Sequence, residues 1–158
     1  MKIRVVSRPS VTGNGAFEKA APYMTRAAAR VSGGAGPVEV TLVGERRMAM
    51  LNRSYKGRRG AAEILTFDYG EQGGASPDDP RGEILLCWKR LATGARRRGV
   101  SARAYLLRLL VHGLCHLAGH SHGTDERAAR MESAERRALE GILTRRELDR
   151  IFGPVTDG

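Results

Sequence analysis

The sequence contains little of three features that would each indicate a particular class of protein. Its 158 residues include only two cysteines, Cys87 and Cys115, so a disulfide-stabilised secreted scaffold is not expected. No run of about 18 apolar residues is present, which excludes a membrane-spanning helix. Charges interrupt residues 1–6 too soon for a signal peptide. We therefore expect a cytoplasmic protein without a membrane partner, in which both thiols are small buried hydrophobes and not metal ligands.

Acidic residues are also scarce, because the chain has 17 of them against 27 lysines and arginines, a formal net charge of +10. This excess favours a polyanionic partner, with nucleic acid as the first candidate. The alternative is that a genome rich in arginine codons raised the arginine content without a binding role. The run Arg96, Arg97 and Arg98 also has a structural interpretation, since cations near the end of a helix suit its dipole.

The periodicity of the apolar residues divides the chain into strands and helices. Pro22 falls within the first predicted helix and should either kink it or mark its first turn. The order strand, helix, strand, helix, strand, strand and then helices predicts an α+β fold, a small mixed sheet packed against helices, as one domain over residues 1–158. The predicted strands cover residues 2–7, 38–43, 64–67 and 83–87, and the predicted helices cover 17–31, 45–55, 88–99, a segment capped by Ser101, 124–141 and 144–153.

All four histidines lie within residues 112–122, which read His-Gly-Leu-Cys-His-Leu-Ala-Gly-His-Ser-His. His112 and His116 are four residues apart, so an α-helix places both imidazoles on one face, one turn apart. Gly119 suits the left-handed conformation that ends helices, and the chain can turn back there to bring His122 to the same metal ion. We predict these three histidines as ligands and His120 as a solvated loop residue. This helix should lie at the centre of the fold.

The predicted ligand set suits zinc, because neutral imidazoles bind Zn²⁺ at about 2.0–2.1 Å. Three protein ligands leave one position open, as in catalytic zinc sites, so we expect one catalytic Zn²⁺ per chain. The same histidine spacing occurs in the metzincin motif His-Glu-x-x-His-x-x-Gly-x-x-His. The glutamate that acts there as general base is Gly113 here, and a glycine carries no proton. Peptide hydrolysis of the usual kind is therefore not expected.

The motif and three upstream segments resemble the YbeY family of bacterial endoribonucleases and rRNA maturation factors. The family motif is similar to His-Gly-x-Leu-His-Leu-x-Gly-x-Asp-His, with Ser121 in place of its aspartate. Residues 51–57, Leu-Asn-Arg-Ser-Tyr-Lys-Gly, resemble its Leu-Asn-x-x-Tyr-Arg-Gly, and 63–67, Glu-Ile-Leu-Thr-Phe, resemble its Asp/Asn-Val-Leu-Ser-Phe. Gly-Glu-Ile at 82–84 resembles Gly-Asp-Ile. The resemblance covers about residues 38–140 in the same order.

This resemblance implies a zinc-dependent, single-strand-specific endoribonuclease that acts in 16S rRNA 3′-end maturation and in ribosome quality control. Ribosomal RNA and the small ribosomal subunit would be its partners. The family's functionally important arginine corresponds to Lys56, and its Asp/Asn corresponds to Glu63. The predicted RNA-binding residues are Lys56, Arg58, Arg59, Arg96, Arg97 and Arg98.

Chemistry suggests catalytic roles for some of these residues. Lys56 or Arg59 would stabilise the negative charge that develops on a phosphate, and Glu63 would position the water or a ligand histidine. The alternative for Glu63 is a surface charge at the edge of a strand. For the whole protein, two alternatives remain. One is a metallohydrolase of another substrate such as a peptide, and the other is a non-catalytic ribosome-associated RNA-binding factor whose metal is structural.

Overall fold

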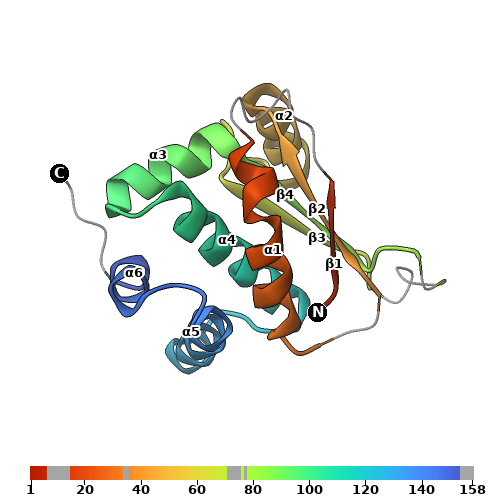
Figure 1. The fold of residues 1–158 in the computed structure, drawn as a ribbon. Coiled ribbons are helices and arrows are strands. Elements are labelled where there is room, and N and C mark those ends of the chain that lie inside the picture. Colours follow the sequence, from red (N-terminus) through yellow and green to blue (C-terminus); the bar gives the residue numbers. More distant parts are fainter. Residues whose placement is uncertain (7–14, 34–35, 71–75, 77, 154–158) are drawn as a thin grey trace.

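The computed structural model describes residues 1–6, 15–33, 36–70, 76 and 78–153. The described residues form a four-stranded sheet with the order β1-β2-β4-β3, which helices cover on both faces (Figure 1). Strands β1, β2 and β4 are parallel, and β3 pairs with β4 in the antiparallel sense, so the predicted mixed sheet and α+β class are confirmed. The elements are β1 (Ile3–Val6), α1 (Ala16–Ala29), β2 (Val38–Val43), α2 (Glu45–Lys56), β3 (Ile64–Asp68), β4 (Gly82–Cys87), α3 (Trp88–Arg98), α4 (Ala102–Leu117), α5 (Asp125–Leu139) and α6 (Arg145–Ile151).

The sheet is buried on both faces, which explains why β4 reads as a continuous apolar run. Successive side chains of a strand point to opposite faces. Ile84 and Leu86 accordingly join the main core beneath α1 and α4, whereas Leu85 and Cys87 join a smaller cluster with Met48 of α2. Helix α2 therefore covers the face opposite to α4.

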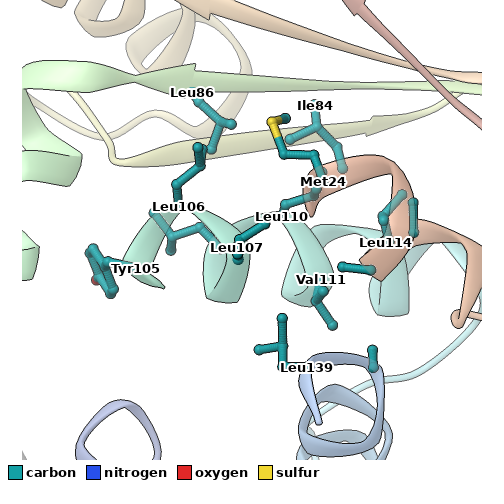
Figure 2. Packing of buried hydrophobic residues seen from close by; sticks show 14 of the residues in the cluster. Met24, Ile84, Leu86, Tyr105, Leu106, Leu107, Leu110, Val111, Leu114 and Leu139 are labelled. Carbon is teal, nitrogen blue, oxygen red and sulfur yellow. The ribbon is translucent and has the colours of Figure 1, made fainter. Parts of the chain in front are cut away.

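Helix α4 is surrounded by other elements and contributes ten of the 29 buried residues of the main core cluster. Its leucines Leu106 and Leu110 point toward the sheet and toward Met24 of α1, while Val111 points toward Leu139 of α5 (Figure 2). The helix begins where Ser101 accepts a hydrogen bond from the backbone N–H of Ala104 at 3.1 Å, which is the predicted cap. The prediction that the histidine helix lies at the centre of the fold is confirmed.

Gly113 is a point of close contact between α4 and the sheet. A Cβ atom on this residue would lie 3.0 Å from Ile84 Cδ1 and 3.0 Å from Thr66 Oγ1. The position that holds the glutamate of a metzincin is thus packed against β3 and β4. Any large side chain there would push the helix away from the sheet.

The sequence left two positions open for Pro22, the interior of the first helix or its first turn. Helix α1 begins at Ala16, so Pro22 lies in its interior and does not mark its first turn; the burial of Phe17 and Met24 keeps the first turn helical. Helix α6 begins with a capping box formed by Thr144 and Glu147. Within the described residues, no helix is both long and apolar enough to cross a bilayer.

Candidate metal centre

Three of the four histidines meet at the C-terminal end of α4. The ligand atoms of His112, His116 and His122 all lie within 4.8 Å of one another, a grouping that could hold a metal ion. The Nε2 atoms of His112 and His116 are 3.2 Å apart. The His122 ring stacks on that of His112 with 5.8 Å between centroids, although it comes from beyond the helix. The structure thus brings together the three predicted ligands.

The turn after α4 carries His122 back toward the helix. Gly119 has a φ of 98°, a left-handed conformation that glycine adopts without strain. The N–H of His120 donates to the carbonyl of Cys115 at 2.9 Å and closes the turn. Arg81 donates through Nη2 to the carbonyl of Leu117 at 2.7 Å, which satisfies one of the free carbonyls at the helix end. The predicted role of Gly119 is confirmed.

Each histidine on α4 uses its Nδ1 atom for a hydrogen bond away from the metal position. His112 Nδ1 lies 3.0 Å from Glu135 Oε1, and His116 Nδ1 lies 3.2 Å from the backbone oxygen of His120. A carboxylate and a carbonyl only accept hydrogen bonds, so both Nδ1 atoms carry the proton in the neutral rings. Both Nε2 atoms are then unprotonated acceptors.

Two lone pairs that face each other at 3.2 Å repel unless a cation lies between them. Burial, together with neighbouring His112 and His122, lowers the pKa of His116. A proton is therefore disfavoured as the cation between the two Nε2 atoms. Two nitrogens bound tetrahedrally to one ion at about 2.0–2.1 Å would be roughly 3.3 Å apart, close to the observed separation. The residues present therefore fit a metal ion.

Glu135 of α5 is a member of this site that the sequence reasoning missed. Glu135 is 2% exposed. The Nε atom of Arg108 on α4 lies 2.8 Å from Glu135 Oε2. The two side chains form an ion pair, but their angle is not that of a hydrogen bond. A carboxylate behind a histidine fixes the ring orientation and raises its basicity toward the metal. One signal was available, because Glu135 falls on the apolar face of α5 with Met131, Ala138 and Leu139.

The histidines open into a pocket of about 480 Å³ between α4, β3 and the end of α2. Its charged members include two predicted cations, Lys56 and Arg58, both exposed. Asp68, at the end of β3, is the carboxylate among its lining residues and was not predicted. The full lining is Asn52, Lys56, Arg58, Ala62, Ile64, Leu65, Thr66, Asp68, His112, His116, Leu117 and His122.

The other predicted site residues lie outside this pocket. Glu63 accepts a hydrogen bond from the hydroxyl of Tyr105 at 2.6 Å, near the start of α4. This contact, with burial as the larger cause, raises the pKa of Tyr105 to about 12. Arg59 lines a separate groove beside α2. Glu63 directly precedes β3, and its hydrogen bond to Tyr105 places it at the opposite end of α4 from the histidines, which sequence spacing could not show.

The run Arg96–Arg98 is also remote from the histidines. It ends α3, beside the start of α4, whereas His112 follows Ser101 by roughly 16 Å of helix at 1.5 Å per residue. Arg98 donates to the carbonyl of Ile151 at 3.1 Å and lies over the Tyr105 ring. The two thiols, Cys87 and Cys115, are free and buried, as predicted, and burial raises the pKa of Cys115 to about 12.

The sequence and the fold both match known proteins. The sequence model of the family described as Endoribonuclease YbeY matches residues 15–142. The protein named Endoribonuclease YbeY from Azoarcus sp. (strain BH72) is 39% identical over 108 residues, 66% of this chain and 43% of that protein. The one from Aromatoleum aromaticum is 36% identical over 106 residues, 67% of this chain and 66% of that protein. The chain spans about half the length of the first curated relatives that it matches.

The solution structure of TM1509 from Thermotoga maritima has a TM-score of 0.54 to this one, with 22% identity over 87% of this chain and 89% of that one. At this identity the likeness supports the fold alone. The family match is of a different kind, because it runs from the start of α1 through α5 and contains the whole histidine motif. This chain therefore belongs to the Endoribonuclease YbeY family.

Proposed function

We propose that this chain is a zinc-dependent endoribonuclease that cleaves single-stranded RNA. The observation that carries the proposal is the pair of unprotonated Nε2 atoms on His112 and His116, 3.2 Å apart in a pocket that also presents cations. A metal beside exposed lysine and arginine side chains suits a phosphodiester. The family name supports the same activity.

His112, His116 and His122 would hold the ion, and zinc is the metal that three neutral imidazoles suit best. When bound, such an ion supplies Lewis acidity toward a phosphoryl oxygen and toward the attacking water. Within the described residues, no fourth histidine, cysteine or carboxylate belongs to the ligand group, which leaves a position for substrate. This favours catalysis over a purely structural metal.

The other residues of the pocket have roles that follow from their chemistry. Lys56 and Arg58 would bind the phosphate and stabilise the additional negative charge of the transition state. Asp68 would orient the attacking water and accept its proton, since its carboxylate lines the pocket. Glu135 would hold His112 in the tautomer that presents Nε2. This assignment gives Asp68 the role that the sequence predicted for Glu63. A Glu63→Gln variant should therefore keep its cleavage activity.

The alternative of peptide hydrolysis is not favoured. The family of proteases with the same histidine spacing uses a glutamate at the position of Gly113, and here Ile84 and Thr66 occupy the space that such a side chain needs. The basic lining of the pocket also suits a phosphate more than an uncharged peptide bond.

The cellular role rests on the family resemblance. We place the chain in the cytoplasm, in 16S rRNA 3′-end maturation and ribosome quality control, with ribosomal RNA and the small subunit as partners. Residues 1–158 would form one hydrolase domain. Correct trimming of a precursor 16S 3′ end by the purified protein, but not by its ligand variants, would support this role.

The central test compares His116→Ala with His120→Ala. His116 is a proposed ligand, whereas His120 contributes its backbone carbonyl, which alanine retains. We expect His116→Ala to lose stoichiometric metal and cleavage of single-stranded RNA, and His120→Ala to keep both. Metal content is measured by elemental analysis and cleavage on labelled single-stranded and duplex RNA. A metal-loaded parent that leaves single-stranded RNA intact would overturn the nuclease proposal.

A further inference from the structure

A second groove, of about 570 Å³, lies on the outer face of α2. Residues 46, 49, 50 and 53 follow the spacing i, i+3, i+4 and i+7 and therefore share one helix face. The turn after the helix forms the rest of the wall. The lining residues are Arg46, Ala49, Met50, Arg53, Gly57, Arg58, Arg59 and Gly60.

The charge of this groove is uncompensated. Its four arginines are exposed, and among the described residues none of their side chains makes an ion pair or hydrogen bond. The one acidic residue of α2, Glu45, instead pairs with Lys89 and Arg90 at 3.3 Å each. Guanidinium groups match the geometry of phosphate oxygens, so the groove suits a chain of phosphates.

The lining of the groove also includes apolar side chains. Met50 is 63% exposed and lies between the arginines beside Ala49, although a methionine on a water-facing helix side gains nothing from packing. Proteins bind single-stranded nucleic acid in positively charged grooves that follow its backbone, and the exposed Met50 offers an apolar surface against which a base can lie.

The groove adjoins the metal pocket, because Arg58 lines both. The junction is fixed by the chain itself. Gly57 takes a left-handed φ of 64°, and the buried side chain of Asn52 donates to the carbonyl of Gly60 at 3.0 Å. A strand that leaves the histidines past Arg58 therefore meets Arg59, Arg53 and Arg46 in a fixed arrangement.

We propose that this groove binds the single-stranded RNA that flanks the cleaved bond, with Arg46 and Arg53 on its phosphates. The inference depends on the proposed nuclease function for its substrate, but it concerns residues outside the metal pocket. It assigns RNA binding to the outer face of α2 and not to the arginines at the end of α3.

The test removes two charges from the groove in Arg46→Ala/Arg53→Ala. The matched control, Arg137→Ala/Arg145→Ala, removes two exposed arginines from α5 and α6. RNA binding to the metal-loaded proteins is followed by fluorescence anisotropy across salt concentrations, with RNAs of about four and about 20 nucleotides. Two lost phosphate contacts should reduce the slope of log K against log salt by about 1.4, which is roughly a 25-fold loss of affinity for the longer RNA at about 0.1 M salt.

Arg46→Lys/Arg53→Lys should keep a slope close to that of the parent, because it retains the charges. The gain in affinity from the short to the long RNA should shrink in the alanine variant only, while unfolding by circular dichroism stays parental. Equal salt slopes for the groove variant, its control and the parent would overturn the proposal, and would leave the groove to another partner such as an acidic protein. A parent that binds the long RNA through this groove without cleaving it would instead refute the nuclease function and leave the groove assignment standing.

Discussion

Glu135 Oε1 lies 3.0 Å from His112 Nδ1, so a carboxylate buried on α5 orients a proposed metal ligand on α4. The same carboxylate neutralises Arg108, whose Nε lies 2.8 Å from Oε2. One residue thus couples the metal centre to the packing of two helices. Loss of its charge should affect both metal affinity and fold stability, for separable reasons.

Glu135→Gln should bind metal about 10- to 100-fold more weakly, because the amide no longer raises the basicity of His112. It should also lower the free energy of unfolding of the metal-free protein by about 3 kcal/mol, since Arg108 stays largely buried without a counter-charge. Chelator competition and urea unfolding measure the two effects. The control is Glu132→Gln, an exposed glutamate on the same helix. Adding Arg108→Met should restore stability but not metal affinity; parental metal affinity in Glu135→Gln would contradict the orienting role.

The cations at the end of α2 and in the turn that follows it should have different roles, some in chemistry and some in RNA binding. Lys56→Ala and Arg58→Ala should each reduce cleavage by about 10- to 1000-fold, as expected for the loss of a transition-state donor. Arg59→Ala should mainly raise KM, because Arg59 lines the outer groove and not the histidine pocket. Steady-state kinetics on one single-stranded RNA compares all three. Metal content and thermal stability should stay parental, since these side chains are exposed, and unfolding of any variant would make the turn structural.

The stability of the metal-free protein should fall as the pH drops below about 6.5, the ordinary pKa of histidine. Burial lowers the pKa of His116 in the folded state, so between the lowered and the ordinary value the unfolded chain binds a proton that the folded chain does not. The contribution of neutral His116 to the free energy of unfolding is therefore complete above pH 6.5 and is lost as the pH falls. Urea unfolding of the parent and His116→Gln at pH 8 to 5 tests this sign. Parallel pH profiles for the two proteins would show that His116 contributes nothing.

Gly113→Glu restores the metzincin motif on paper but should destabilise this fold by about 3 kcal/mol or more. The new carboxylate would be forced between Ile84 and Thr66 without a partner, at a position where even an added Cβ atom would lie only 3.0 Å from each. Thermal unfolding by circular dichroism measures the loss. Gly44→Glu is the matched control, because no atom lies within 4 Å of its added Cβ. A stable Gly113→Glu protein that hydrolyses peptides would reverse the argument against protease chemistry.

Local spacing was enough to predict much of the site. The i, i+4 pair of His112 and His116 needs only helix geometry, and Gly119 needs only its freedom at positive φ, so sequence reasoning found the three proposed ligands. The continuous apolar run of β4 and the cap at Ser101 are local in the same sense, as were most element boundaries. Pro22 was misplaced as a possible first-turn residue because the burial of α1 outweighed its local preference.

The residues that complete the site were decided by tertiary structure. Glu135 and His112 are 23 positions apart, and Asp68 lines the same pocket as the histidines only because β3 lies beside α4. The same packing brings Glu63 to Tyr105 and places Arg59 in the lining of a neighbouring groove. Both residues are nevertheless close in sequence to Lys56 and Arg58. The sequence alone determined which side chains share a helix face, because that depends on helix geometry. Which faces meet across the molecule depended on how α4 packs between the sheet and α5, and no local spacing encodes that contact.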